Sequence, residues 1–193
     1  MTTARDPARS YREIDDADLE RLGRIADADL VAFFARNPHL AGWRDRVAAV
    51  ALAQGAAEHR VHGKRGIWDF DIIVCFADTD ALPVLMRRQV TTWDWGPSKF
   101  GRCPYDPPEY TGRAVDVKLW VIPAAADPVE ALKLWLARRA AKHSSPGRKA
   151  DVAHEAVVLV RPCFGLVVWE PSVAPPPKTR SDGHRKPQGL APP

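Results

Sequence analysis

The 193-residue chain contains few cysteines and no long apolar segment. Its three cysteines, Cys75, Cys103 and Cys163, are widely spaced and odd in number. This spacing excludes both a disulfide framework and a zinc pattern of closely spaced pairs. No apolar run approaches the roughly 20 residues that a membrane span requires. The first residues also lack the apolar core of a signal peptide. We therefore expect a cytoplasmic protein that makes no membrane contact.

An extended stretch of basic sequence is also lacking. The formal net charge is +4, and three of these charges fall in residues 172–193. The remainder does not show the basic patch that is typical of a nucleic-acid-binding domain, so we do not expect long nucleic acids as partners. An apolar fraction of 46% and a charged fraction of 27% are typical of a globular domain. We expect one domain over residues 13–171, a frayed tail over residues 1–12 and a disordered, proline-rich tail over residues 172–193.

The most informative stretch of the sequence is residues 68–76, WDFDIIVCF. It is rich in β-branched and aromatic residues and has no Gly or Pro, which predicts a strand. Side chains alternate across a strand, so Asp69 and Asp71 share one face while apolar residues occupy the other. Two adjacent carboxylates repel each other, and Mg²⁺ with its preference for oxygen ligands would relieve this repulsion. The simpler interpretation is a pair of solvated Asp residues at the start of a strand.

A second strand is predicted over residues 113–122, with Asp116 among apolar neighbours. A carboxylate in the middle of a strand requires a partner. One interpretation is a salt bridge to Lys118 or to Arg113. The other is a third carboxylate that joins Asp69 and Asp71 at one site.

Ahead of the two Asp residues lies an apolar run over residues 47–53 that predicts a buried strand or a helix. Gln54, Gly55 and the helix-forming residues after them indicate a strand-to-helix turn. The free N–H groups at such a turn bind phosphate oxygens. Further helices are expected over residues 15–37, in one or two segments, and over residues 128–142.

Other segments complete the expected secondary structure. We expect a short helix over residues 82–88 and strands over residues 89–95 and 165–169. The long irregular stretch 96–112 is either a functional loop or a connection. Within it, Lys99 and Arg102 are candidate substrate contacts. His59 and His62 are interpreted as surface or hydrogen-bonded histidines rather than metal ligands.

The order of these features resembles the nucleotidyltransferase fold of the DNA polymerase β superfamily. That family has a hydrophobic residue, a Gly followed by Gly or Ser, a strand with Asp-x-Asp, and a third carboxylate on a neighbouring strand. Here Asp69 follows Gly55 by 14 positions. The resemblance covers residues 47–122 and implies an α+β fold with a mixed β-sheet flanked by helices. One departure is Ala56, which lacks the hydroxyl that a serine would offer to a phosphate.

By this resemblance, Asp69, Asp71 and Asp116 would be catalytic carboxylates that hold Mg²⁺ or Mn²⁺. The expected nucleotide contacts are Gly55, Ala56, Lys64, Arg65 and Lys118. The implied reaction transfers a nucleoside monophosphate from an NTP to an acceptor hydroxyl on a protein, an RNA end or a small molecule. A non-catalytic binding module of the same fold is the alternative, which Ala56 favours and the three Asp residues oppose. A third interpretation is an α/β domain in which the Asp spacing is fortuitous.

Overall fold

A computed structural model describes residues 6–85, 91–142 and 152–171 of the chain. The helices are α1 (Asp16–Arg36), η1 (Pro38–Arg46), α2 (Gln54–His62), α3 (Pro128–Lys142) and η2 (Val152–His154), where η marks a 3₁₀ helix. The strands are β1 (Val47–Ala53), β2 (Phe70–Ala77), β3 (Thr91–Asp94), β4 (Ala114–Ile122), β5 (Val157–Arg161) and β6 (Val167–Trp169). The tail expected over residues 172–193 lies outside the described residues.

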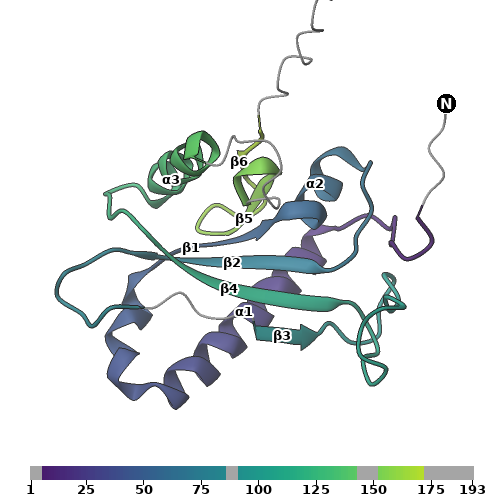
Figure 1. Ribbon diagram of the computed structural model, residues 1–193, viewed down its shortest axis with the longest axis horizontal. Helices are drawn as coiled ribbons and strands as arrows, with labels where there is room; N and C mark the ends of the chain where they lie inside the picture. The colour runs from purple at the N-terminus through teal and green to yellow at the C-terminus, as the bar shows by residue number, and fades with distance from the viewer. Residues whose placement is uncertain (1–5, 86–90, 143–151, 172–193) are drawn as a thin grey trace, which may run out of the picture.

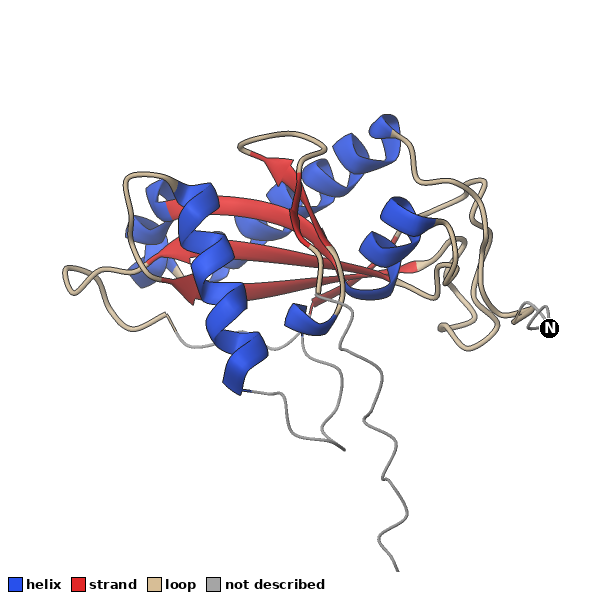
Figure 2. Cartoon of the chain, turned by 90° about the horizontal axis from the view of Figure 1, so that it is seen from above, coloured by secondary structure: helices blue, strands red, loops and turns tan. Residues whose placement is uncertain are grey.

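The six strands form one mixed sheet in the order β3-β4-β2-β1-β5-β6 (Figure 1). Strands β2 and β4 pair in parallel, and the other neighbours pair antiparallel. Helices lie on both faces of this sheet (Figure 2). The structure therefore confirms the α+β class expected from the sequence, at the level of a mixed sheet with flanking helices.

The sheet separates two apolar cores, and β2 contributes to both. Phe70, Ile72, Val74 and Phe76 pack in the core beneath α1, whereas alternate residues such as Ile73 pack in the core beneath α3. This alternation confirms the predicted strand, which begins at Phe70 rather than at residue 68. Asp71 and Ile73 are two positions apart in β2, so both side chains lie on the face of the sheet that α3 covers. Asp71 lies at the end of that face, beyond the edge of the core beneath α3.

Helix α1 is one continuous helix. Asp15 caps its N-terminus in a capping box with Asp18. Of the one or two segments expected over residues 15–37, the structure has one. Asp29 is buried and accepts a hydrogen bond from Trp93 Nε1 at 3.2 Å. A tertiary partner thus satisfies a carboxylate that would otherwise favour a helix start.

Of the tail expected over residues 1–12, residues 1–5 lie outside the described residues, and residues 6–12 pack against the domain. Ser10 pairs with Ile67 in an antiparallel bridge, and Ala8 is buried. Arg113 Nη1 donates to the Ala8 carbonyl at 2.6 Å. Backbone hydrogen bonds and a distant arginine therefore hold a segment whose own composition is polar.

Two other expected segments can be compared with the structure. Residues 82–85 are not helical, and residues 86–88 of the expected helix lie outside the described residues. The long stretch 96–112 is irregular, as expected, and buries Phe100 and Cys103. Within the described ranges, no helix has the length and apolar character needed to cross a membrane.

Candidate functional site

The starts of β2 and β4 place two of the expected carboxylates side by side. In the parallel register, Asp71 is the partner of Asp116, and on the antiparallel side Asp71 is the partner of Ala53. Thr92 on β3 is the partner of Asp116. A single row across the sheet therefore joins both carboxylates to the last residue of β1. Helix α2 begins at the next residue, Gln54.

A cavity of about 290 Å³ opens beside this row and is named here the carboxylate cavity. Six residues expected at the site line it: Gly55, Arg65, Asp69, Asp71, Asp116 and Lys118. Four lining residues were not expected: Arg9, Gln54, Trp68 and Glu155. The cavity therefore gathers residues from the N-terminal segment, α2, β2, β4 and the segment before β5.

Ala56 and Lys64 lie outside the lining of this cavity. Ala56 is only 2% exposed and packs in the core beneath α1, because the third residue of α2 faces inward. Lys64 is exposed in the loop after α2. Neither side chain therefore lines the cavity, and contact of these two residues with a nucleotide stays a prediction.

Lys118 provides the closest counter-charge to the carboxylates. Its Nζ forms an ion pair with Asp71 Oδ1. Asp116 Oδ1 instead accepts a hydrogen bond from Thr92 Oγ1 at 2.9 Å. Of the two partners that the sequence suggested for Asp116, Arg113 donates to the carbonyls of Ala8, Trp68 and Phe100. Asp116 is thus held by a neutral hydroxyl.

Two carboxylates of this cavity, those of Asp69 and Asp71, are costly to keep ionised. Burial raises the pKa of Asp71 to about 6, with Asp69 and Asp116 adding to the rise and Lys118 opposing it. Burial also raises the pKa of Asp69, and repulsion from Asp116 adds to this. Such shifts are characteristic of like charges held together in a poorly solvated site. A bound cation would lower both pKa values.

The chemistry of these donors suits a hard divalent cation, because all three are carboxylates. Among the described residues, however, no group of three or more His, Cys, Asp or Glu side chains is arranged as a ready metal site. A physical reason is visible in the ion pair, since the Lys118 ammonium already takes an oxygen of Asp71. A cation that takes this same oxygen of Asp71 would therefore have to displace the Lys118 ammonium.

The N-terminus of α2 lies at the same cavity. No side chain caps this helix end, so its first N–H groups are not satisfied by a capping residue. Gln54 has a φ of 56°, in the left-handed region that is unfavourable for a non-glycine residue. A Cβ added at Gly55 would meet nothing within 4 Å, so open space lies over the helix start. These features leave room for an anion at the α2 N-terminus.

Two cations at the rim are already partnered. Arg65 forms an ion pair with Glu155, whose side chain is 9% exposed. Arg9 lies over the Trp68 ring at 5.3 Å and donates to the Gly66 carbonyl at 3.2 Å. Trp68 also stacks on Tyr105, with ring centroids 5.2 Å apart. Arg9 and Glu155 are far from the Asp motif in sequence, and no local pattern marks either residue.

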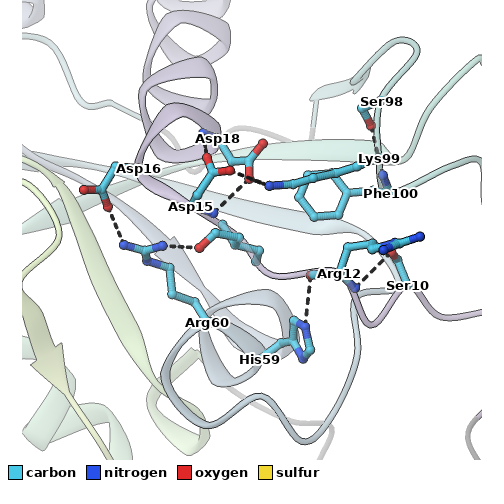
Figure 3. Close-up of polar contacts among 11 residues, drawn as sticks. Ser10, Arg12, Asp15, Asp16, Asp18, His59, Arg60, Ser98, Lys99 and Phe100 are labelled. Carbon is cyan, nitrogen blue, oxygen red and sulfur yellow. Dashed lines mark hydrogen bonds and ion pairs between the residues drawn. The ribbon is translucent and has the colours of Figure 1, made fainter.

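His59 has a structural role, as the sequence suggested. It is buried, its Nδ1 accepts from the Gly66 N–H at 3.2 Å, and its Nε2 lies 3.1 Å from the Arg12 carbonyl (Figure 3). The Gly66 bond requires an unprotonated Nδ1, so Nε2 carries the proton and donates to Arg12. His59 thereby joins α2 to the two segments that border the carboxylate cavity.

Comparison of the chain with protein-family models, with curated proteins and with solved structures finds no match. The chemistry of this protein is therefore inferred from the geometry of the carboxylate cavity.

Proposed function

We propose that the protein is a Mg²⁺- or Mn²⁺-dependent nucleotidyltransferase that acts from the carboxylate cavity. The observation that carries this proposal is the register of Asp71 and Asp116 on adjacent parallel strands, with Asp69 in the same cavity. Carboxylates so placed, next to a helix N-terminus, combine a cation site with a phosphate site. The resemblance of the sequence to the DNA polymerase β superfamily supports the same conclusion.

Asp69, Asp71 and Asp116 would hold the metal, which would neutralise charge on the phosphates and on the attacking oxygen. Lys118, once released from Asp71, would place its ammonium against a phosphate oxygen. The backbone N–H groups at the start of α2 would bind further phosphate oxygens. Because Ala56 faces the core, this binding relies on backbone donors rather than on a hydroxyl.

The proposed reaction transfers a nucleoside monophosphate to an acceptor hydroxyl. The acceptor oxygen forms a bond to the α-phosphorus as the bond from that phosphorus to the β-phosphate bridging oxygen breaks. Pyrophosphate leaves with that electron pair, and Asp116 accepts the hydroxyl proton. Protein groups act by positioning reactants and balancing charge, as is typical of phosphoryl transfer.

A non-catalytic module of the same fold is the second candidate. The ion pair of Lys118 with Asp71 favours it, because Lys118 already supplies the positive charge that a bound cation would otherwise supply to Asp71. The raised pKa values of Asp69 and Asp71 oppose it, because a binding module gains nothing from retaining buried carboxylates that repel each other.

The deciding experiment is calorimetric binding of each of the four NTPs with Mg²⁺ or Mn²⁺, using wild type, Asp69→Ala and Asp116→Ala. We expect metal-dependent binding by wild type and its loss in both variants. Asp80→Ala is the matched control, because Asp80 is exposed beyond the opposite end of β2. Absence of binding by folded wild type, or equal binding by the Asp116→Ala variant, would overturn the proposal.

A further inference from the structure

A second cavity, of about 360 Å³, borders the N-terminal segment and is named here the arginine cavity. Its lining includes Arg9, Arg12, Lys99 and Arg113 together with the aromatic residues Tyr11 and Phe100. The described lining contains no carboxylate. Four cationic side chains therefore line one small volume without an acidic side chain among them.

The counter-charges of these four cations are unequal. Lys99 is held by Asp15 at 2.6 Å and by Asp18 at 2.8 Å, as Figure 3 shows. Arg9 has a weaker ion pair with Asp6 at 3.5 Å. Within the described part of the chain, neither Arg12 nor Arg113 has a carboxylate within ion-pair distance. Two guanidinium groups thus remain available to balance an anion.

Arg113 is the most informative member of this group. Its residue is 3% exposed, and its hydrogen bonds go to the carbonyls of Phe100, Ala8 and Trp68. A buried guanidinium that meets only neutral acceptors retains its full charge in a poorly solvated place. Asp106 and Asp69 act on this charge only from beyond ion-pair distance, so an anion in the arginine cavity would provide a direct counter-charge.

The arginine cavity is connected to the carboxylate cavity through shared residues. Arg9 lines both cavities. Arg113 directly precedes β4, the strand of Asp116, and contacts the carbonyl of Trp68, which directly precedes Asp69. An anion bound by these arginines would therefore lie next to the backbone that positions two of the three carboxylates.

We propose that the arginine cavity binds a phosphate group of a small phosphorylated acceptor. This inference rests on the proposed function, because it names the substrate that receives the nucleotide in the neighbouring cavity. The guanidinium groups of Arg9, Arg12 and Arg113 present planar, charged donors of the kind that bind phosphate oxygens. The volume accommodates one such group, and the NTP phosphates have their own donors at α2.

The test measures binding of inorganic phosphate by calorimetry at low ionic strength, with wild type, Arg12→Gln and Asp116→Ala. Arg12 is exposed, so its replacement leaves the fold intact. We expect Arg12→Gln to weaken phosphate binding at least ~10-fold, the loss of one charge-assisted contact. Asp116→Ala should not weaken it. Arg138→Gln, an exposed arginine of α3, is the matched control and should bind phosphate like wild type.

Competition with Mg²⁺ and NTP identifies the source of the phosphate. If the site serves an acceptor, phosphate and the metal–NTP complex bind together, and Arg12→Gln leaves NTP affinity unchanged. Displacement of phosphate by NTP, with weaker NTP binding in Arg12→Gln, would instead place the NTP's own phosphates there and overturn the inference. Equal phosphate affinity in wild type and Arg12→Gln would also overturn it. Phosphate binding without any NTP binding would reject the proposed function and leave the anion site standing.

Discussion

Asp71 of β2 and Asp116 of β4 are register partners on adjacent parallel strands. Each has a different companion, because Lys118 pairs with Asp71 and Thr92 donates to Asp116. The two carboxylates thus have different partners although they share a row of the sheet. Burial raises the pKa of Asp71 to about 6, and this shift has measurable consequences.

Replacing Asp71 with Asn should stabilise the metal-free protein at pH 7.5. The folded state retains the Asp71 proton up to pH about 6, whereas an unfolded chain releases it near pH 4. The folded state therefore binds more protons between these values, so this group's contribution to stability increases as the pH falls from about 6 to about 4. At pH 7.5 the charged group is unfavourable, and Asn removes that penalty.

Thermal unfolding in EDTA would check this prediction. We expect Asp71→Asn to raise Tm at pH 7.5 by a few degrees, roughly the effect of 1–2 kcal/mol in a domain of this size. The difference from wild type should shrink as the pH is lowered toward about 4. A Tm difference that stays constant over this range would show that the Asp71 carboxylate is not the cause. The same variant should lose Mn²⁺ affinity.

Replacing Lys118 with Ala should affect metal and nucleotide binding in opposite directions. Without its ammonium, Asp71 has both oxygens free for a cation, so Mn²⁺ alone should bind more tightly. The nucleotide complex should bind about tenfold more weakly, because a charge-assisted contact to phosphate is lost. Calorimetry with Mn²⁺ alone and then with Mn²⁺ and NTP separates the two effects. If the affinities for Mn²⁺ alone and for the nucleotide complex both rose or both fell, Lys118 would not move from Asp71 to a phosphate.

A serine at position 56 should not add a contact to a nucleotide phosphate. Ala56 is buried in the core beneath α1, so the hydroxyl of Ala56→Ser would enter an apolar environment. We expect a loss of about 1–2 kcal/mol in the free energy of unfolding. NTP affinity should remain that of wild type. Urea unfolding and calorimetry provide the two readouts, and a gain in NTP affinity would show that position 56 faces the nucleotide.

Asp94 should anchor the long loop that follows β3. Partial burial opposes ionisation, but hydrogen bonds from the N–H groups of Thr111, Gly96 and Gly112 lower its pKa to about 2. A lowered pKa in the folded state means that this contribution is present above pH 4 and is lost as the pH falls toward about 2. Asp94→Ala should therefore destabilise the protein at pH 7 and have little effect at pH 2.

Hydrogen exchange at pH 7 provides the local readout for Asp94→Ala. Faster exchange should be confined to the amides of Gly96, Thr111 and Gly112, which lose their acceptor. The amides of β2 should exchange as in wild type. Uniformly faster exchange across the sheet would show that the effect is global rather than local.

The local elements of this protein follow from short patterns in its sequence. Alternating apolar residues define β2, and Asp15 with Asp18 supplies the capping box of α1. The same alternation places Asp71 on the face opposite Phe70, because the period of a strand is two residues. These features depend on neighbours in the chain, so a local pattern is enough to predict them.

Only the tertiary structure decided how the site is composed. The parallel pairing that aligns Asp71 with Asp116 depends on which strands meet, and no local pattern specifies that register. The structure likewise brings Arg9 and Glu155 to the carboxylate cavity from distant segments, and it turns Ala56 into the core. Competition for counter-charges is also settled in three dimensions, since Lys118 takes Asp71 rather than Asp116 as its partner. Contacts between distant segments form only when the chain is folded, and for that reason the sequence pattern did not contain them.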